Sequence, residues 1–201
     1  MRAFHLPSHH FERQRWKNQL GWTLEITRAS ALPASAADYA WRASIAEIEQ
    51  DCAFSSFPGM QRILMLLHGE GMRMTLGDGR HTDLTPPYGR IAFSGDEAAH
   101  CSLHAGSTRD FNLIWDPATI DASLNLRPLV GPMLFFAQPR TSWLIYQCSG
   151  QSALKGGLAH MQAGDAMRLD SDDATGGRWI LDGNGEIIVC AMRPRPGAAP
   201  E

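Results

Sequence analysis

An arginine introduces a strongly apolar run in this chain. In FSSFPGMQRILMLLHG, Arg62 follows a Phe-Pro-Gly turn and opens five consecutive apolar residues, 63–67. A buried strand does not require a guanidinium there. Arg62 therefore either reaches solvent where the strand begins or points into a cavity that needs a positive charge. A guanidinium suits bidentate binding of a carboxylate, and this is the chemistry that the second alternative predicts.

A second arginine lies in the segment WRASIAEI, residues 41–48. The segment is ambiguous, because its alanines suit a helix whereas Trp41 and the two isoleucines suit a strand. As a strand it places Arg42, Ser44 and Ala46 on one face. That face would present a guanidinium and a hydroxyl together.

Acidic and amide side chains are available to meet these arginines. Glu25 lies in WTLEITR (22–28), on the face opposite the apolar residues, and in DFNLIWD (110–116) Asp110 and Asn112 point the same way. Two readings stay open: the arginines are exposed or paired internally, or they form a fork for a small carboxylate. We expect a net positive pocket in which Arg62 lies near Arg42, Ser44 and Asn112, and in which Glu25 orients an arginine.

Catalytic motifs are scarce. The chain has no G-x-S-x-G and no cysteine in an activating context, and Ser55 and Ser56 suit turn hydrogen bonds better than nucleophilic attack. No G-x-x-x-x-G-K-[ST] phosphate loop occurs. A general acid–base pair drawn from Glu25, Asp96 and Asp110 stays open, because the sequence does not fix the distances between them.

The elements that must hold these residues are short strands. Segments bounded by Gly, Pro or Asp recur at 22–28, 62–69, 71–76, 89–95, 99–106 and 110–116, and a second series begins near Pro132. Many short strands with frequent turns predict an all-β barrel or sandwich. We expect one short helix around 117–127, a hairpin turn at GNGE (183–186) and a frayed tail, RPRPGAAPE.

The two series share an order of elements, including a Gly-Asp pair in each, Gly95-Asp96 and Gly164-Asp165. This order suggests two β-modules of similar plan, one spanning 1–115 and the other 116–201.

Bulk composition excludes several classes of function. The chain has 201 residues, 44% of them hydrophobic, which suffices for a hydrophobic core. Its formal charge of −3 gives no excess of positive charge for binding nucleic acid. No 18-residue apolar run or secretory signal is present, so we expect no membrane partner and a cytoplasmic location. The four widely spaced cysteines read as buried thiols in a reducing compartment.

Several segments together resemble the HutD/Ves family. They are WKNQLGWTLEI (16–26), WRASIAEI (41–48), FSSFPGMQR (54–62), FSGDEAAHCSL (93–103) and STRDFNLIW (107–115), and the resemblance covers roughly residues 12–193. It implies a cupin-like (RmlC-like jelly-roll) fold with two β-barrel halves. It also implies a link to histidine utilisation.

The chain departs from the family pattern in two places: after the FPG turn, where the pair is Gln61-Arg62, and at one loop. The family usually has W-K-N-G-G-G, whereas here Trp16-Lys17-Asn18 is followed by Gln19-Leu20-Gly21. Losing two glycines restricts the backbone there. If this loop forms a wall of the pocket, Trp16 and Asn18 contact the ligand and the ligand preference differs from that of other members.

We expect no metal and no other cofactor. The usual cupin signature needs H-x-H, which is absent. His100 and His104 are four residues apart in a predicted strand, so their Cα atoms lie roughly 13 Å apart, too far to share one ion.

Two functions from different classes follow. The resemblance implies a regulatory or metabolite-sensing protein that binds a small anionic metabolite such as urocanate or formylglutamate. The alternative is a metal-independent isomerase or hydrolase with Glu25 or Asp110 as its base; we favour the binder. A structural protein with a filled barrel is a third reading, and a homodimer is open.

Overall fold

The structure is a computed structural model that describes residues 1–30, 38–156, 160–172 and 176–195. These residues form β-strands and one 3₁₀ turn, Ser8–His10, with no α-helix among them, so the all-β prediction is confirmed. None of the described segments forms a helix long and apolar enough to cross a membrane. The predicted frayed tail lies mostly outside the described residues.

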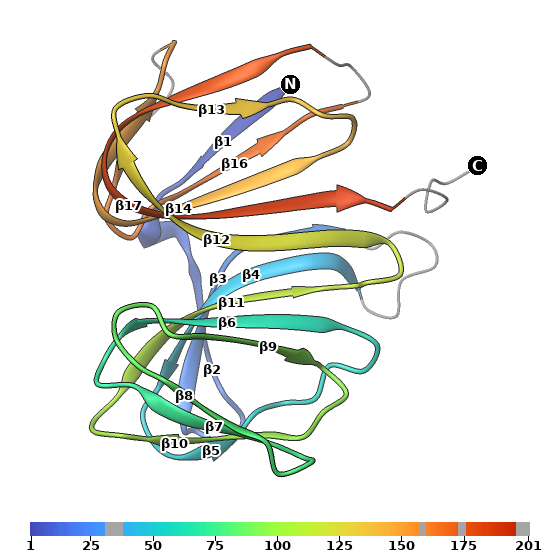
Figure 1. The fold of residues 1–201 in the computed structure, drawn as a ribbon, viewed down its shortest axis with the longest axis vertical. Coiled ribbons are helices and arrows are strands. Elements are labelled where there is room, and N and C mark those ends of the chain that lie inside the picture. Colours follow the sequence, from blue (N-terminus) through green and yellow to red (C-terminus); the bar gives the residue numbers. More distant parts are fainter. Residues whose placement is uncertain (31–37, 157–159, 173–175, 196–201) are drawn as a thin grey trace. The chain divides into compact units, whose positions relative to one another are not determined.

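The chain divides into two compact units. Residues 12–119 form one, the N-unit, and residues 1–11 with 120–199 form the other, the C-unit. The N-terminal strand belongs to the C-unit because β1 (Arg2–Leu6) pairs with β16 (Ala166–Asp170). The division predicted from the sequence, after residue 115, follows chain order and does not include this return of the N-terminus (Figure 1).

The N-unit contains two sheets. The larger runs in the order β2 (Glu12–Arg15), β3 (Gly21–Ser30), β4 (Tyr39–Ile48), β11 (Thr108–Trp115), β6 (Gln61–His68), β9 (Arg90–Ser94). The smaller runs β5 (Cys52–Ala53), β10 (Ala99–Leu103), β7 (Met72–Leu76), β8 (His81–Leu84). All pairs are antiparallel, and the ambiguous segment 41–48 is strand β4.

Apolar side chains from both sheets of the N-unit pack together in one buried cluster. The buried cluster includes Leu64 of the large sheet together with Met74 and Cys101 of the small one. Trp16, Phe54 and three other partly buried apolar residues pack against its edge. Both sheets therefore share one apolar core.

The C-unit is a single curled sheet in the order β1, β16, β14 (Ser142–Leu154), β17 (Arg178–Pro194), β12 (Ile120–Val130). Strand β13 (Met133–Phe136) also pairs with β17, and β15 (His160–Gln162) pairs with β14.

Two local predictions in this unit were wrong. The helix expected around 117–127 is strand β12, because eleven residues pair along β17 and this tertiary pairing overrides the local helix propensity. The hairpin turn expected at GNGE is absent, because residues 183–186 continue through β17.

The glycines of GNGE let strand β17 approach strand β14 closely. A Cβ on Gly183 would lie 2.2 Å from the Gln151 carbonyl oxygen, and one on Gly185 would lie 2.0 Å from that of Ser149. Only glycine fits such an approach of two backbones.

Candidate functional site

The pairing register of the large N-unit sheet places the predicted polar residues on one face. Arg62 pairs with Ile114, which pairs with Arg42, so the two arginines occupy one row across three strands. Two strand spacings amount to about 9–10 Å. The next row on this face contains Asn112, Ser44 and Glu25.

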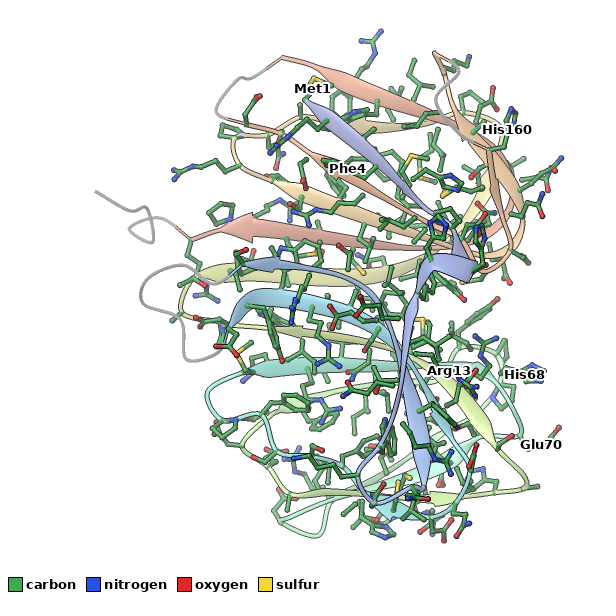
Figure 2. The ribbon with its side chains drawn as sticks, turned by 180° about the vertical axis from the view of Figure 1, so that it is seen from behind. Met1, Phe4, Arg13, His68, Glu70 and His160 are labelled. Carbon is green, nitrogen blue, oxygen red and sulfur yellow. The ribbon has the colours of Figure 1, made fainter. Side chains whose placement is uncertain are left out.

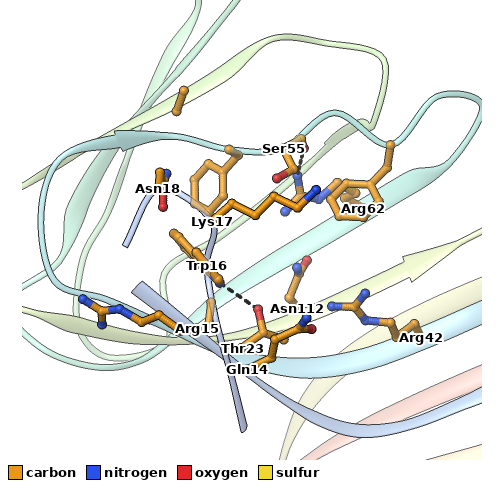
Figure 3. Close-up of a pocket in the computed structure, with 14 residues that line it drawn as sticks. Gln14, Arg15, Trp16, Lys17, Asn18, Thr23, Arg42, Ser55, Arg62 and Asn112 are labelled. Atoms are coloured by element: carbon orange, nitrogen blue, oxygen red, sulfur yellow. Dashed lines mark hydrogen bonds between the residues drawn. The ribbon is translucent and has the colours of Figure 1, made fainter. Parts of the chain in front are cut away.

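A cavity of about 450 Å³ opens on this face (Figure 3). It lies entirely within the N-unit. Five of the eight residues proposed from the sequence line it: Trp16, Asn18, Arg42, Arg62 and Asn112. The other lining residues are Gln14, Arg15, Lys17, Thr23, Ala46, Ala53, Phe54, Ser55 and Phe57.

Arg62 is the most unusual residue of the cavity, because its side chain is only 2% exposed. Its guanidinium carbon lies 5.3, 4.9 and 4.9 Å from the ring centroids of Phe54, Phe57 and Phe93. One Nη1–H donates to the carbonyl oxygen of Ser55 at 3.3 Å, and Nε has no hydrogen-bond acceptor among the described residues. Three aromatic faces therefore hold the cation in place without neutralising it.

No described carboxylate pairs with Arg62. Burial, the largest effect, lowers the pKa of Arg62 to about 10, the phenol of Tyr39 raises it and nearby Arg42 lowers it further. A pKa near 10 keeps the guanidinium charged at neutral pH. A buried charge without a counter-ion is costly, and no described residue supplies one for Arg62.

Arg42, in contrast, has an acidic partner. Its Nε lies 3.4 Å from an Oε2 of Glu25, close enough for an ion pair although the angle does not make a hydrogen bond. Glu25 also lies 3.5 Å from Nε of Arg28. Glu25 does not line the cavity, so it faces the arginines and not the cavity space.

The remaining polar residues of the prediction take different positions. Asn112 lines the cavity, is 8% exposed, and its Oδ1 has no hydrogen-bond donor among the described residues. Ser44 is buried and does not line the cavity.

Asp110 is buried away from the cavity, where it accepts a hydrogen bond from Thr108 Oγ1 at 2.8 Å. Burial raises the pKa of Asp110 to about 8. This carboxyl is therefore largely neutral at neutral pH and does not offset the charge of the arginines.

The loop after β2 forms one wall of the cavity. The indole N–H of Trp16 donates to Thr23 Oγ1 at 2.8 Å, and its ring meets Phe54 edge-on at 6.4 Å between centroids. Asn18 Oδ1 accepts a hydrogen bond from the backbone N–H of Leu20 at 3.1 Å. These contacts fix the loop, and Figure 3 shows the extended side chain of Lys17 reaching over the cavity.

The charged side chains that line the cavity are all cationic. Four cationic side chains line it, namely Arg15, Lys17, Arg42 and Arg62, and the lining includes no Asp, Glu, His or Cys among the described residues. Arg15 is paired with Glu49 at 2.9 Å, as Arg42 is with Glu25. The cavity can hold an anion, but its lining offers no carboxylate, imidazole or thiolate as a general base.

Within the described residues, no three His, Cys, Asp or Glu side chains are grouped closely enough to hold a metal ion. Figure 2 shows His68 and Glu70 at the β6–β7 turn, where both are exposed. His100 is exposed on β10, and His104 lies beyond the end of that strand, 3.3 Å from Asp83.

Several lining residues were not foreseen from the sequence. Thr23 shares the Glu25 face by period two, so the same alternation could have found it. Phe54 and Phe57 precede an arginine in FSSFPGMQR, a pattern that cation–π contacts explain. Lys17 lies between Trp16 and Asn18, the two loop residues that were proposed from the sequence.

Comparison with known proteins decides the family. The HutD family model matches residues 8–189, which is most of the chain. The chain belongs to the HutD family. An uncharacterised 21.2-kDa protein in the hutC 3′ region of Pseudomonas putida is 35% identical over 175 residues, which cover 84% of this chain and 87% of that protein.

Solved structures agree with this HutD assignment. HutD from Pseudomonas fluorescens, solved in a formate condition, is 29% identical with a TM-score of 0.81, covering 96% of this chain and 100% of that one. YhhW from Escherichia coli has a TM-score of 0.68 at 10% identity, covering 97% and 98%, and so shows the fold alone. Neighbours of the cupin-like and pirin families are consistent with a jelly roll.

Proposed function

We propose that this HutD protein binds a small carboxylate metabolite in the N-unit cavity and acts as a metabolite sensor. The observation that carries the proposal is Arg62, a buried guanidinium that lines the cavity and has no acidic partner among the described residues. A carboxylate that enters would provide the missing counter-ion and accept the unused Nε–H.

The size and polarity of the cavity fit a small ligand. Its volume of about 450 Å³ falls in the usual range for small-molecule sites, roughly 300–1,000 Å³. Asn112 Oδ1, on the same face, receives no hydrogen bond from the described residues, so it suits a ligand that also carries an N–H donor.

Urocanate and formylglutamate both combine a carboxylate with an N–H group, and they are our candidates. The hut names of the P. putida and P. fluorescens relatives support a role in histidine utilisation.

The competing function is a metal-independent isomerase or hydrolase. It needs a base in contact with the substrate. Glu25 does not line the cavity and is paired with Arg28 and Arg42, and Asp110, which has a raised pKa, is buried and does not line the cavity either. Neither lies where a bound molecule would be deprotonated, and this arrangement favours the binder.

A thermal-shift screen tests the proposal. The panel contains urocanate, formylglutamate, formate and succinate, with imidazole as a control that lacks a carboxylate. We expect at least one carboxylate to raise the melting temperature while imidazole does not. A protein that no carboxylate stabilises would contradict the proposal, and NMR detection of a converted carboxylate would favour the enzyme.

A further inference from the structure

Two cysteines that lie 49 positions apart in sequence meet in the core of the N-unit. Cys52 of β5 is the direct cross-strand neighbour of Cys101 of β10, and their sulfur atoms lie 3.6 Å apart. Both thiols are free and buried, with exposures of 3% and 0%. The wide spacing of the cysteines in the sequence gives no sign of this contact, which the fold of the N-unit creates.

The backbone geometry at this pair suits a disulfide. The N–H of Phe54 bonds to the carbonyl of Ala99, and in an antiparallel ladder hydrogen-bonded pairs recur at every second residue, so Cys52 and Cys101 also form such a pair. The Cα atoms of such a pair are about 5.5 Å apart. Disulfides prefer about 5.5–6 Å between Cα atoms, so a bond requires little backbone movement.

The pair is also connected to the cavity wall. Strand β5 has two residues and forms the edge of its sheet, where it pairs with β10 alone. The chain continues from Cys52 through Ala53 and Phe54 to Ser55, all three of which line the cavity, and the carbonyl of Ser55 accepts the hydrogen bond from Arg62.

We propose that Cys52 and Cys101 form a reversible disulfide by exchange with a low-molecular-weight disulfide, and that this bond alters the cavity wall beside Arg62. The Cys52 thiolate attacks one sulfur of the small disulfide and expels one small thiol. Cys101, after losing its proton to solvent, then attacks the Cys52 sulfur and expels the second small thiol. Two protein thiols are oxidised and one small disulfide is reduced to two thiols.

The order of attack follows from the contact between the thiols. A hydrogen bond with Cys101 lowers the pKa of Cys52, while the same contact and burial raise the pKa of Cys101. Cys52 therefore loses its proton more readily than Cys101. It also lies on the short edge strand β5, whose separation from the sheet breaks few backbone hydrogen bonds.

Bond formation must move one strand. The sulfurs would approach from 3.6 Å to about 2.05 Å in a closely packed core. Because β5 has one neighbouring strand, the displacement falls on it and on the residues that follow, Phe54 and Ser55.

Peptide mapping tests the disulfide itself. Trypsin places Cys52 in residues 43–62 and Cys101 in residues 91–109, apart from the peptides of Cys148 and Cys190. The folded full-length protein is treated with oxidised glutathione, its remaining thiols are alkylated, and the digest is analysed by mass spectrometry.

We expect a linked 43–62/91–109 peptide that dithiothreitol reverses and that is absent from Cys52→Ala and Cys101→Ala. If wild type yields only glutathione adducts, unmodified Cys52 and Cys101, or links between other cysteines, the proposal is overturned. This readout does not depend on either variant folding, because the wild-type chain gives the answer.

The effect on the cavity rests on the proposed anion binding, so reduced and oxidised protein are both titrated with urocanate. We expect oxidation to weaken urocanate binding on the order of tenfold, the size of one lost hydrogen bond to a charged group. Equal affinities in both states would overturn the coupling. If reduced protein binds no urocanate, the urocanate assignment fails and the linked peptide still decides the disulfide.

Discussion

At the scale of the residue, the N-unit contains a guanidinium whose charge the described residues leave unbalanced. Arg62 is nearly inaccessible, contacts three phenylalanine rings and donates to one carbonyl oxygen. Burying a charge without a counter-ion costs free energy. In a purely structural role, an arginine would offset this cost by pairing with a carboxylate. Arg42 has such a partner in Glu25, and this contrast between the two arginines is why we propose Arg62 as the anion-binding residue.

Asp110 gives a pH-dependent prediction. Its carboxyl has a pKa of about 8 in the folded protein against 3.8 as the ordinary value, so the folded state holds more protons between these pH values. The contribution of Asp110 to stability is therefore lost as the pH rises from about 4 to about 8. Asp110→Asn, which keeps an acceptor for Thr108, should be increasingly more stable than wild type across this window, by up to about 1.4 kcal/mol per pH unit.

Urea unfolding at several pH values measures the difference. Asp121→Asn, which changes an exposed carboxylate on β12, serves as the control and should follow wild type. A constant difference between Asp110→Asn and wild type from pH 5 to pH 8 would contradict the raised pKa.

The sequence shows that a charged residue, Arg62, opens an apolar strand. It does not show that this arginine lacks an acidic partner among the described residues. Period two correctly put Asp110 and Asn112 on one face, because alternation is a local property of a strand. It could not show that Asp110 is buried beside Thr108 while Asn112 reaches the cavity. That difference depends on the second sheet and on the loop after β2.

At the scale of the element, strand identity was largely predictable in the N-unit because turns and apolar runs mark each strand. The failures occurred in the C-unit, at β12 and at GNGE. In both places long-range pairing with β17 or β14 decides the backbone conformation, and local propensity carries no signal of those partners.

The loop after β2 is strained at the position where the family pattern has glycine. Gln19 has φ of 61°, in the left-handed region, and its N–H donates to the Trp16 carbonyl at 3.0 Å. A non-glycine residue there costs about 1–2 kcal/mol, partly offset because glycine has more freedom in the unfolded chain.

Gln19→Gly should therefore stabilise the protein by about 0.5–1 kcal/mol in chemical denaturation. Leu20→Gly, the adjacent substitution at a residue without positive φ, should destabilise it because it removes an apolar side chain that packs on the N-unit core. A Gln19→Gly variant less stable than wild type would show that the glutamine side chain makes a compensating contact.

At the scale of the whole molecule, the two units share a β plan but not the same interior. In the C-unit, large apolar side chains fill the core, among them Phe135, Ile145 and Met161. Its buried Gln147 is satisfied by Ser152 and by two backbone carbonyls. The N-unit instead has a cavity lined by cationic and aromatic groups.

This asymmetry predicts one ligand per chain. Isothermal titration with a carboxylate that stabilises the protein should give a stoichiometry of one, because apolar side chains fill the C-unit core and its buried Gln147 is already hydrogen-bonded. Two equivalent sites per chain would contradict the assignment of binding to the N-unit alone.

Calorimetric titration of Arg62→Ala with a carboxylate that binds wild type tests whether Arg62 is the anion-binding residue. We expect a loss of roughly tenfold to hundredfold in affinity, the size of a charge-assisted hydrogen bond of about 1.5–3 kcal/mol, with the fold retained by circular dichroism. Arg109→Ala removes an equal charge from the exposed face of β11 and should bind as wild type does. Equal affinity of Arg62→Ala and wild type would show that Arg62 does not bind the anion and would contradict the proposed function.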